Sequence, residues 1–417
     1  MRVAIQTLGT RGDVQPYIAL ARGLSERGHD VQIAAPVQFE AMVGGHGITF
    51  APLPGEILEL IDRPAGKAAL ASSRGFGAGL KLLKHMRPLM RPLLDAEWAA
   101  VRTFAPDVIV GHPKSLAAPH MAEALGCPYV LASPLPGFTP TSAFPTPLLP
   151  FASLGPFNRI SHALATLGPG LLFGKRIREW RKKAIGVDRR RSTASLRSGT
   201  IYAYSPKVVP VPPDWGSDVL VSGYWFLDSD DWQPSEGLAA FLEAGEPPVY
   251  VGFGSMPGLD PQGLTSTVVE ALGRTGKRGL LATGGGALGA VSTPANVHVI
   301  AGAPHDRLFP RVAATIHHGG AGTTAASLRA GRPTVVCPFF GDQPFWGRRV
   351  AELGVGPDPL DPKALTVESL AAAIMAMDDL NMRSRAAALG TAIRKEDGVA
   401  AAVDFIEGIA SGKTALP

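Results

Sequence analysis

Two histidines precede a glycine-rich turn in the segment HHGGAGTT at residues 317–324. The apolar run before it predicts a strand, and the run TTAASLRAG predicts a helix. Backbone N–H groups at a helix N-terminus bind phosphate, and glycines let the phosphate approach the backbone closely. His317 and His318 would supply hydrogen bonds or charge, and two threonines would add hydroxyl donors. The segment indicates a diphosphate site, although a helix capped by its own threonines would use the same residues.

An acidic residue, Asp13, lies in the first glycine-containing segment, GTRGDVQP, after the apolar run VAIQTL at 3–8. The spacing is not the GxGxxG of dinucleotide-binding domains, and a carboxylate here would repel a pyrophosphate. A carboxylate that faces a neutral hydroxyl can instead act as a general base. The alternative is a structural one, in which Asp13 caps a helix that begins near Gln15.

A third polar pair, Asp342 and Gln343, stands in the aromatic segment PFFGDQPFWG at 338–347. A carboxylate beside an amide offers several hydrogen bonds of the kind that sugar hydroxyls accept and donate. Taken alone, the segment favours an exposed turn over a sugar site.

The elements that position these residues follow a repeated strand–loop–helix–strand pattern. The first unit joins the strand at 3–8 to a helix from Pro16 to about Glu26 and a strand at 31–35. The pattern restarts with VYVGFGS at 249–255, a helix near 262–274 and the strand GLLATG, and again at 313–320. Such units build parallel sheets covered by helices, so the sequence predicts an α/β protein with two Rossmann-like domains.

The domain boundaries follow from where the pattern stops and restarts. We expect an N-terminal domain at 1–215, a linker at 216–237 and a C-terminal domain at 238–398. The linker range contains GYWFLDSDDWQPSEG, which is rich in turn-forming and aromatic residues. The length of 417 residues suits two domains of about 200 residues each.

The composition narrows the classes of partner. Two cysteines far apart, Cys127 and Cys337, predict neither a disulfide framework nor a cysteine metal site. The N-terminus lacks the apolar core of a signal peptide, and no run of 18 apolar residues occurs, so a cytoplasmic protein is expected. The net charge is +5, and no nucleic-acid-binding motif accompanies it, so no nucleic acid is expected as a partner.

Two segments of the N-terminal half could meet an apolar or anionic partner. Residues 175–197 contain ten Lys or Arg against Glu179 and Asp188, which predicts either a transient contact with an anionic membrane surface or a solvated helical face. Residues 134–156, PLPGFTPTSAFPTPLLPFASLGP, hold too many prolines for a regular helix. This segment either packs as a surface loop or lines an apolar acceptor pocket.

Together with APHDRLFP at 303–310, the segments GTRGDVQP, HHGGAGTT and PFFGDQPFWG make the chain resemble the GT-B glycosyltransferases of family 1 (the UDP-glycosyltransferase superfamily). The likeness runs from residue 1 to about 355 and is greatest to sterol and lipid glucosyltransferases, with bacterial natural-product glycosyltransferases near them. It implies the GT-B fold, in which two Rossmann-like domains face each other across a cleft and a last helix, here about 399–417, returns to the first domain.

The resemblance also implies a reaction. It implies an inverting hexosyltransferase that needs no metal and no cofactor, because the nucleotide sugar is a co-substrate. The donor would be UDP-glucose, or alternatively a dTDP-sugar, and the acceptor an apolar molecule with a hydroxyl, such as a sterol, a lipid or a natural-product aglycone. The oligomeric state and the glycosylated position do not follow from the resemblance.

Individual roles carry over to the positions that match the motifs. Asp13 takes the place of the catalytic base, and His112 falls near the place of the partner of that base. The residues expected at the donor are Thr10, Arg11, Gly12, Ser255, Ala303, His305, His317, His318, Gly320, Ala321, Gly322, Thr323, Asp342 and Gln343. Of these, Ala303 and His305 would contact the nucleotide base, His317 or His318 the diphosphate, and Asp342 with Gln343 the transferred sugar.

Two positions depart from the plant members of the family. Gly302 and Ala325 stand where those members carry a tryptophan against uracil and a glutamate on the ribose, so the resemblance does not separate uridine from thymidine. Two other functions remain open at this stage. One is a GT-B-type sugar-nucleotide epimerase, which would not need the apolar segment 134–156. The other is a non-catalytic nucleotide-sugar-binding partner protein, which would not need Asp13.

Overall fold

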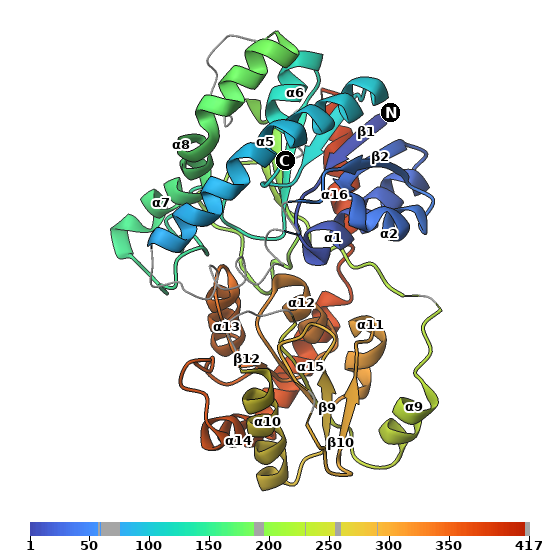
Figure 1. Cartoon of the computed structure of the whole chain (residues 1–417), viewed down its shortest axis with the longest axis vertical. Coiled ribbons are helices and arrows are strands. Elements are labelled where there is room, and N and C mark those ends of the chain that lie inside the picture. Colours follow the sequence, from blue (N-terminus) through green and yellow to red (C-terminus); the bar gives the residue numbers. More distant parts are fainter. Residues whose placement is uncertain are drawn as a thin grey trace.

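The computed structural model describes residues 1–56, 59, 76–186, 196–229, 231–254, 260–289 and 291–412, with the side chains of 76–85 left out. It has two parallel sheets, each covered by helices (Figure 1). The GT-B class of α/β fold predicted from the sequence is confirmed by these sheets together with the structural neighbours reported below.

The first sheet has seven strands in the order β3-β2-β1-β4-β5-β6-β7, and every neighbouring pair is parallel. The strands are β1 (Arg2–Gln6), β2 (Asp30–Pro36), β3 (Thr49–Leu53), β4 (Val108–Gly111), β5 (Tyr129–Ser133), β6 (Gly199–Tyr202) and β7 (Val219–Val221). Its helices are α1 (Arg11–Glu26), α2 (Glu40–Gly44), α5 (Phe76–Phe104), α6 (Ala118–Leu125), α7 (Asn158–Ser161) and α8 (Ala163–Trp180). Short helical turns lie at Val37–Phe39, Gly155–Phe157 and Arg181–Ile185.

The second sheet has five parallel strands in the order β10-β9-β8-β11-β12. The strands are β8 (Val249–Gly252), β9 (Gly279–Ala282), β10 (Val297–Ile300), β11 (Ala314–His317) and β12 (Thr334–Val336). The helices are α9 (Glu236–Glu243), α10 (Pro261–Thr275), α11 (His305–Leu308), α12 (Ala321–Arg329), α13 (Gln343–Glu352), α14 (Val367–Ala376), α15 (Leu380–Ile393) and α16 (Gly398–Ala410), and a short turn lies at Phe309–Arg311.

The two sheets share one topological rule. In each, the first strand of the unit pairs with the second on one side and with the fourth on the other, so the strand order reverses beside β1 and beside β8. In open parallel sheets, ligands bind outside the carboxyl ends of the strands at this reversal point. The fold therefore predicts ligand-binding positions at the carboxyl ends of β1 and β4 in one domain and of β8 and β11 in the other.

The start of α1 differs from the expectation. The helix begins at Arg11 instead of Pro16, because Thr10 is the N-cap and its backbone N–H donates to the carboxylate of Asp13 at 2.7 Å. This contact satisfies one of the orphan donors of the first turn. Pro16 lies inside the helix, where its ring nitrogen leaves one backbone hydrogen bond unmade.

The last helix, α16, packs on the N-terminal domain. Its apolar residues Val403 and Ile406 join the core cluster of α1 and the first sheet. A Cβ on Gly23 of α1 would lie 2.3 Å from Val399 of α16, so glycine permits this close approach. The first sheet also extends through β7 into the range expected as linker. The boundaries at 215, 237 and 398 stay a prediction, and residues 413–417 lie outside the described chain.

Residues of both domains also pack together in one apolar cluster. Tyr202 and Tyr204 from the N-terminal domain pack with Trp346 and Ile393 from the C-terminal domain. The rings of Tyr204 and Trp346 meet edge to face, with centroids 6.4 Å apart. None of the helices that the structure describes combines the length and the apolar character needed to cross a bilayer.

Candidate active site between the two domains

Asp13 and His112 meet at the reversal point of the first sheet. Asp13 lies in the first turn of α1, which follows β1, and His112 directly follows β4. The two strands are neighbours, with Gln6 opposite Gly111, so their carboxyl ends deliver both side chains to one place. His112 Nε2 lies 3.2 Å from Asp13 Oδ1. The structure thus brings the expected base and its expected partner together.

The hydrogen bonds around His112 define its tautomer. The backbone N–H of Lys114 donates to His112 Nδ1 at 3.1 Å, so this nitrogen is an acceptor. In a neutral imidazole the other nitrogen then carries the hydrogen, and Nε2–H donates to Asp13. The ring of Tyr17 packs edge to face against His112, with centroids 5.6 Å apart. His112 is only 4% exposed, so its orientation is held on all these sides.

Lys114 completes this group, and the sequence analysis did not identify it. Its Nζ donates to Asp13 Oδ2 at 2.8 Å, while Thr10 donates to the same oxygen from its backbone N–H and from its hydroxyl at 3.2 Å. A signal was present, because Lys114 follows the same strand end as His112, in the segment HPKS. Polar residues just beyond parallel strands share one edge of the sheet.

The charges of the pair are set by opposing effects. Burial raises the pKa of Asp13, but Lys114 and His112 outweigh burial and hold that pKa below its usual range. Burial lowers the pKa of His112, and the carboxylate of Asp13 only partly opposes this. At neutral pH the pair is therefore a carboxylate that accepts a hydrogen bond from a neutral imidazole.

Gly9 allows the carboxylate to sit where it does. Its φ of +131° belongs to a region that favours glycine. A Cβ at this position would lie 2.1 Å from Asp13 Oδ2 and 2.7 Å from Lys114 Nζ. Any side chain would displace the Asp13–Lys114 ion pair. The sequence analysis considered the glycines of this loop only for their spacing and missed this steric requirement.

The second reversal point carries the predicted diphosphate loop. β11 ends at His317, and α12 begins at Ala321 with Gly320 as its N-cap. Gly322 is exposed and Thr323 is half-buried at this helix N-terminus, whereas Thr324 is buried. The backbone N–H groups of the first turn have no partner inside a helix, which suits an anion. The arrangement agrees with the predicted site, and the roles of Gly320, Ala321, Gly322 and Thr323 stay a prediction.

The structure distinguishes the two histidines of the loop. His317 is fully buried, and its Nδ1 accepts a hydrogen bond from the backbone N–H of Gly319 at 3.0 Å. His318 is half-buried and faces the end of β8, because a Cβ on Gly254 would lie 3.4 Å from its ring. The geometry favours His318 as the histidine that faces a diphosphate, and His317 as a support of the turn.

The expected supply of charge by these histidines is not supported at neutral pH. Burial lowers the pKa of His318 to about 4, and burial with His318 nearby lowers the pKa of His317 further. Both rings are neutral in the protein without ligand. They can offer N–H donors to a diphosphate but no formal positive charge.

The region predicted to contact the nucleotide base contains His305, the first residue of α11. Its ring stacks on Phe309, with centroids 4.3 Å apart and planes inclined by 14°. Burial, with a smaller contribution from the positive charge of Arg11, lowers the pKa of His305 to about 4. Arg11 comes from the N-terminal domain, so this coupling places two of the expected donor residues near each other across the domains. Ala303 is half-buried beside them in the chain.

One expected donor residue, Ser255, and one position that departs from the plant members, Ala325, add nothing to the site. Ser255 lies outside the described residues, so its placement is not considered. Ala325, the position compared with a ribose-binding glutamate, is 3% exposed and packs in the apolar cluster with Trp346. Thr10 and Gly12 do lie beside Asp13 at the start of α1, as expected.

Asp342 and Gln343 stand at the N-terminus of α13. The indole N–H of Trp346 donates to Asp342 Oδ2 at 2.7 Å. Burial raises the pKa of Asp342, and the negative charge of Asp13 adds to this effect. Asp342 is thus close enough to Asp13 to feel its charge, although the two residues belong to different domains.

Gln343 has a structural role that the sequence did not reveal. Its Oε1 accepts hydrogen bonds from the backbone N–H groups of Phe339 at 2.7 Å and Phe340 at 3.2 Å. The side chain is 5% exposed and holds the turn that precedes α13. A contact of Gln343 with the transferred sugar stays a prediction.

The apolar segment 134–156 is an ordered loop at the domain boundary. Asp214 anchors it by accepting hydrogen bonds from the Thr141 hydroxyl at 2.6 Å and the Ser142 N–H at 2.8 Å. Phe144 of the loop packs against Phe345 of α13, with ring centroids 5.9 Å apart. The loop is therefore packed and borders the segment that carries Asp342, and the alternative that it lines an acceptor pocket stays a prediction.

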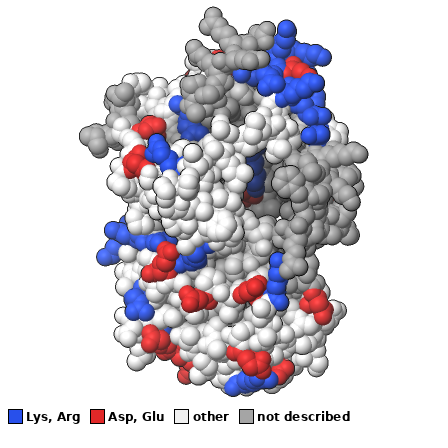
Figure 2. All heavy atoms as spheres, turned by 90° about the vertical axis from the view of Figure 1, so that its left-hand side faces the viewer, with Lys and Arg blue, Asp and Glu red and all other residues white. Residues whose placement is uncertain are grey.

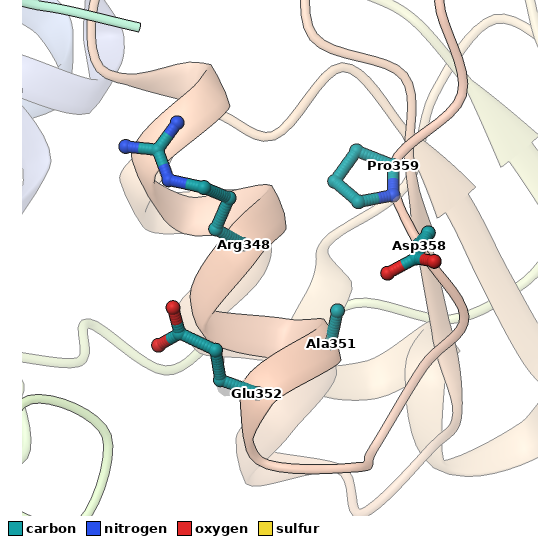
Figure 3. A pocket seen from close by; sticks show the side chains of 5 residues that line it. All are labelled: Arg348, Ala351, Glu352, Asp358 and Pro359. Atoms are coloured by element: carbon teal, nitrogen blue, oxygen red, sulfur yellow. The ribbon is translucent and has the colours of Figure 1, made fainter. Parts of the chain in front are cut away.

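Arg348 of α13 ties the same loop to the C-terminal domain. Its guanidinium donates to the carbonyl oxygens of Pro150 at 3.0 Å and Phe151 at 2.9 Å. Figure 3 shows Arg348 at the rim of a shallow depression between α13 and the segment of Asp358 and Pro359. None of the expected catalytic or donor-binding residues lines this depression, so we do not assign it to the active site. Among the described residues, no cluster of three or more His, Cys, Asp or Glu could hold a metal ion.

Comparisons with known proteins agree with this geometry. Residues 3–145 match the model of the glycosyltransferase family 28 N-terminal domain, and residues 281–397 match that of the erythromycin biosynthesis protein CIII-like C-terminal domain. The chain is 38% identical to a sterol 3-beta-glucosyltransferase of Arabidopsis thaliana, over 97% of this chain and 67% of the relative. It is 39% identical to one of Emericella nidulans, over 97% of this chain and 30% of the relative.

Solved structures support the fold. The glycotransferase of kitacinnamycin has a TM-score of 0.73 at 21% identity and covers 98% of this chain and 99% of its own. The glycosyltransferase VinC, solved in complex with DTDP, has a TM-score of 0.67 at 18% identity, over 99% of this chain and 100% of its own. The chain spans about two thirds of the plant relative above and about a third of the fungal one.

Proposed function

The chain belongs to the GT-B glycosyltransferases of family 1, in the group that includes the sterol glucosyltransferases, and from this membership we propose its reaction. We propose that it transfers glucose from UDP-glucose to the hydroxyl of an apolar acceptor, a sterol or a related lipid. The transfer inverts the anomeric carbon and uses neither a metal nor a cofactor. The cytoplasmic location expected from the sequence is part of this proposal.

One observation supports the proposal above all others. The Asp13–His112 pair, with Nε2–H of His112 directed at the carboxylate, lies across the domain boundary from Asp342 and the diphosphate loop. A hydroxyl with a pKa near 16 is a poor nucleophile, so a base must take its proton as the new bond forms. Asp13 occupies the place where such a base would meet both the acceptor and the sugar.

The transfer forms one bond and breaks another at the anomeric carbon. The acceptor oxygen forms a bond to the anomeric carbon while its proton passes to the carboxylate of Asp13. The bond from the anomeric carbon to the diphosphate breaks, and its electron pair leaves with the diphosphate. His318 and the N–H groups of α12 stabilise the negative charge on the departing group. Attack on the face opposite the leaving group inverts the anomeric centre.

The low pKa of Asp13 is compatible with this role. The proton moves only while the hydroxyl attacks a strongly electrophilic carbon, so the base need not be strong. Lys114 is 54% exposed, so it can leave Oδ2 when the acceptor hydroxyl approaches. His112 remains hydrogen-bonded and keeps the carboxylate oriented.

The donor nucleotide is tested separately from the acceptor, because His305 and Ala303 are compatible with uracil and with thymine. The relatives named sterol 3-beta-glucosyltransferases support glucose as the sugar, and the resemblance implies UDP as its carrier, whereas VinC was solved in complex with DTDP. We therefore propose a direct comparison of UDP-glucose and dTDP-glucose as donors with a panel of sterols, in the presence of a chelator. The expected result is a glucosylated sterol of inverted configuration with UDP-glucose, unchanged by the chelator. Transfer only from dTDP-glucose, or only with added magnesium or manganese, would overturn the corresponding part.

A further inference from the structure

One surface of the N-terminal domain carries a concentration of exposed apolar side chains. Among the described residues, thirteen large apolar side chains are exposed, and eight of them lie between Leu148 and Leu172. These eight are Leu148, Phe151, Phe157, Ile160, Leu164, Leu167, Leu171 and Leu172. Scattered exposed apolar residues are normal, but a concentration in one segment marks an interaction surface. We call this surface the α7–α8 face.

The apolar residues of α8 form a regular stripe. Leu164, Leu167 and Leu171 are spaced by three and four residues, so they lie on one side of the helix. Leu167 is 63% exposed and Leu171 is 86% exposed. A helix on the surface of a globular protein normally carries polar residues on its outer side. The stripe is therefore not explained by the position of α8 in the fold.

The opposite side of α8 packs on the N-terminal domain. Phe173 and Ile177 are buried in a cluster with Met90 of α5. Trp180 is fully buried, and its indole N–H donates to Asp95 Oδ1 at 3.0 Å. Since these contacts fix α8 on the domain, the leucine stripe is free to contact something outside it.

Basic residues extend the same stripe. Lys175 and Arg178 follow Leu171 by four and seven residues, and Arg176 and Lys183 are exposed beside them. Glu179 is the one exposed acidic residue between Lys175 and Lys183. Figure 2 faces this side of the molecule and shows Lys and Arg gathered at its top, where Figure 1 places the C-terminal end of α8.

We infer that the α7–α8 face docks the protein on a lipid bilayer that contains anionic lipids. A bilayer offers an apolar layer beside a negatively charged headgroup layer, which matches an apolar stripe that continues into basic residues. Each exposed leucine would enter the boundary of the acyl chains, and Lys175, Arg176 and Arg178 would contact the headgroups. This extends the contact expected from the basic residues alone to an apolar anchor and names its residues.

The docked face is continuous with the loop proposed to meet the acceptor. Leu148 and Phe151 belong to segment 134–156, and the carbonyl oxygen of Phe151 accepts a hydrogen bond from Arg348 of α13. A protein docked by this face would hold that loop at the membrane surface, where an apolar acceptor is dissolved. This last step rests on the proposed function, whereas the docking itself does not.

The test is the binding of the full chain to vesicles by co-sedimentation. Vesicles of phosphatidylcholine alone are compared with vesicles that also contain phosphatidylglycerol. The wild-type protein is expected to bind the mixed vesicles and to lose most of this binding at high salt. The variant with Leu167→Ser and Leu171→Ser is expected to bind them at least about tenfold more weakly, because two exposed apolar anchors are lost.

The control carries equivalent changes elsewhere. Met375→Ser with Leu380→Ser removes two exposed apolar side chains, 51% and 78% exposed, from the C-terminal domain, and it should bind vesicles like the wild type. Melting temperatures show that both variants fold. Equal binding by both variants, or no binding of the wild type to mixed vesicles, overturns the inference. Loss of self-association in the Leu167→Ser and Leu171→Ser variant, without vesicle binding by the wild type, would assign the face to a second copy of the chain.

The outcome can be separated from that of the proposed function. Transfer to an acceptor presented in detergent should be the same for the wild type and for both pairs of variants. If no transfer occurs with any acceptor but vesicle binding follows the prediction, the proposed reaction fails and the docking surface stands.

Discussion

The N-terminal wall of the interdomain site holds a carboxylate, Asp13, that is kept charged by its partners, whereas the C-terminal wall holds histidines that are kept neutral by burial. In the N-terminal wall, Lys114 and His112 hold the pKa of Asp13 below its usual range. In the C-terminal wall, burial lowers the pKa of His305 and His318 to about 4. Both walls lie at equivalent reversal points of their sheets, so the difference comes from side chains and not from the fold.

The difference suggests a division of labour. A wall that holds a carboxylate between a cation and a directed imidazole N–H is suited to receive a proton at a fixed position. A wall of neutral histidines beside a helix N-terminus is suited to receive an anion, because its donors are already oriented. Asp342, at the N-terminus of α13, belongs to the second wall, and burial with the negative charge of Asp13 raises its pKa.

The largest expected effect comes from removing the base. Asp13→Asn keeps the shape of the side chain and leaves an oxygen that can accept the hydrogen bond from Thr10. Turnover should fall by about 10²–10⁴-fold, the usual contribution of a general base. Steady-state rates with saturating UDP-glucose measure it. A near wild-type rate would move the base elsewhere, and His112 would be the next candidate.

A second effect tests how the N-terminal wall is supported. Glu97 of α5 is buried, accepts a hydrogen bond from the hydroxyl of Ser115, and has a pKa raised by burial to about 8. The folded protein therefore holds a proton that the unfolded chain releases, so stability falls as pH rises from about 5 to 8. Glu97→Gln removes this loss because glutamine does not ionise. The unfolding free energy of the variant should therefore rise relative to that of the wild type, by on the order of a few kcal/mol between pH 6 and pH 9.

Denaturant unfolding at both pH values measures the Glu97 effect. The relevant quantity is the change with pH of the difference in unfolding free energy between the variant and the wild type. A difference that stays constant from pH 6 to pH 9 would show that Glu97 is ionised at both values. Because Ser115 shares a loop with His112 and Lys114, the same variant also shows whether this support reaches the catalytic pair.

A smaller effect concerns the sugar end of the C-terminal wall. Asp342→Ala should slow transfer by roughly tenfold while affinity for free UDP stays nearly unchanged, because UDP lacks the sugar that Asp342 is proposed to hold. Asp342→Asn is the matched control, since it keeps an acceptor for the indole N–H of Trp346. If UDP affinity falls as much as the transfer rate, Asp342 serves the local fold and not the sugar.

Much of the fold could be predicted from the sequence, and the reason is local. Each strand is an apolar run that ends in glycine or in a polar segment. The strand–helix–strand units at 3–35, 249–283 and 313–337 could therefore be predicted from the sequence pattern. The start of α1 was predicted wrongly because Pro16 marks a helix start by itself, whereas the contact between Thr10 and Asp13 that begins the helix at Arg11 depends on three-dimensional geometry.

The sequence identifies the residues of the candidate site, but it does not predict how they contact one another or which of two neighbours faces a ligand. Which strand lies next to β1 is a matter of topology, so the 3.2 Å contact of Asp13 and His112 could only be expected from the resemblance. The sequence also leaves open which of His317 and His318 faces the ligand, because adjacent residues at a strand end point to opposite sides. The full burial of His317 favours His318 as the residue that faces the ligand, and burial also makes both rings neutral.

The division of labour between the two walls is tested most directly by calorimetric titration of UDP into two variants, His318→Ala and Asp13→Asn. The loss of one hydrogen bond to a charged group should weaken UDP binding to His318→Ala by roughly tenfold or more. Asp13→Asn removes a negative charge near the diphosphate, so it should bind UDP as tightly as the wild type or more tightly. Equal weakening in both variants would contradict the account, because it would show that the two walls bind the donor together.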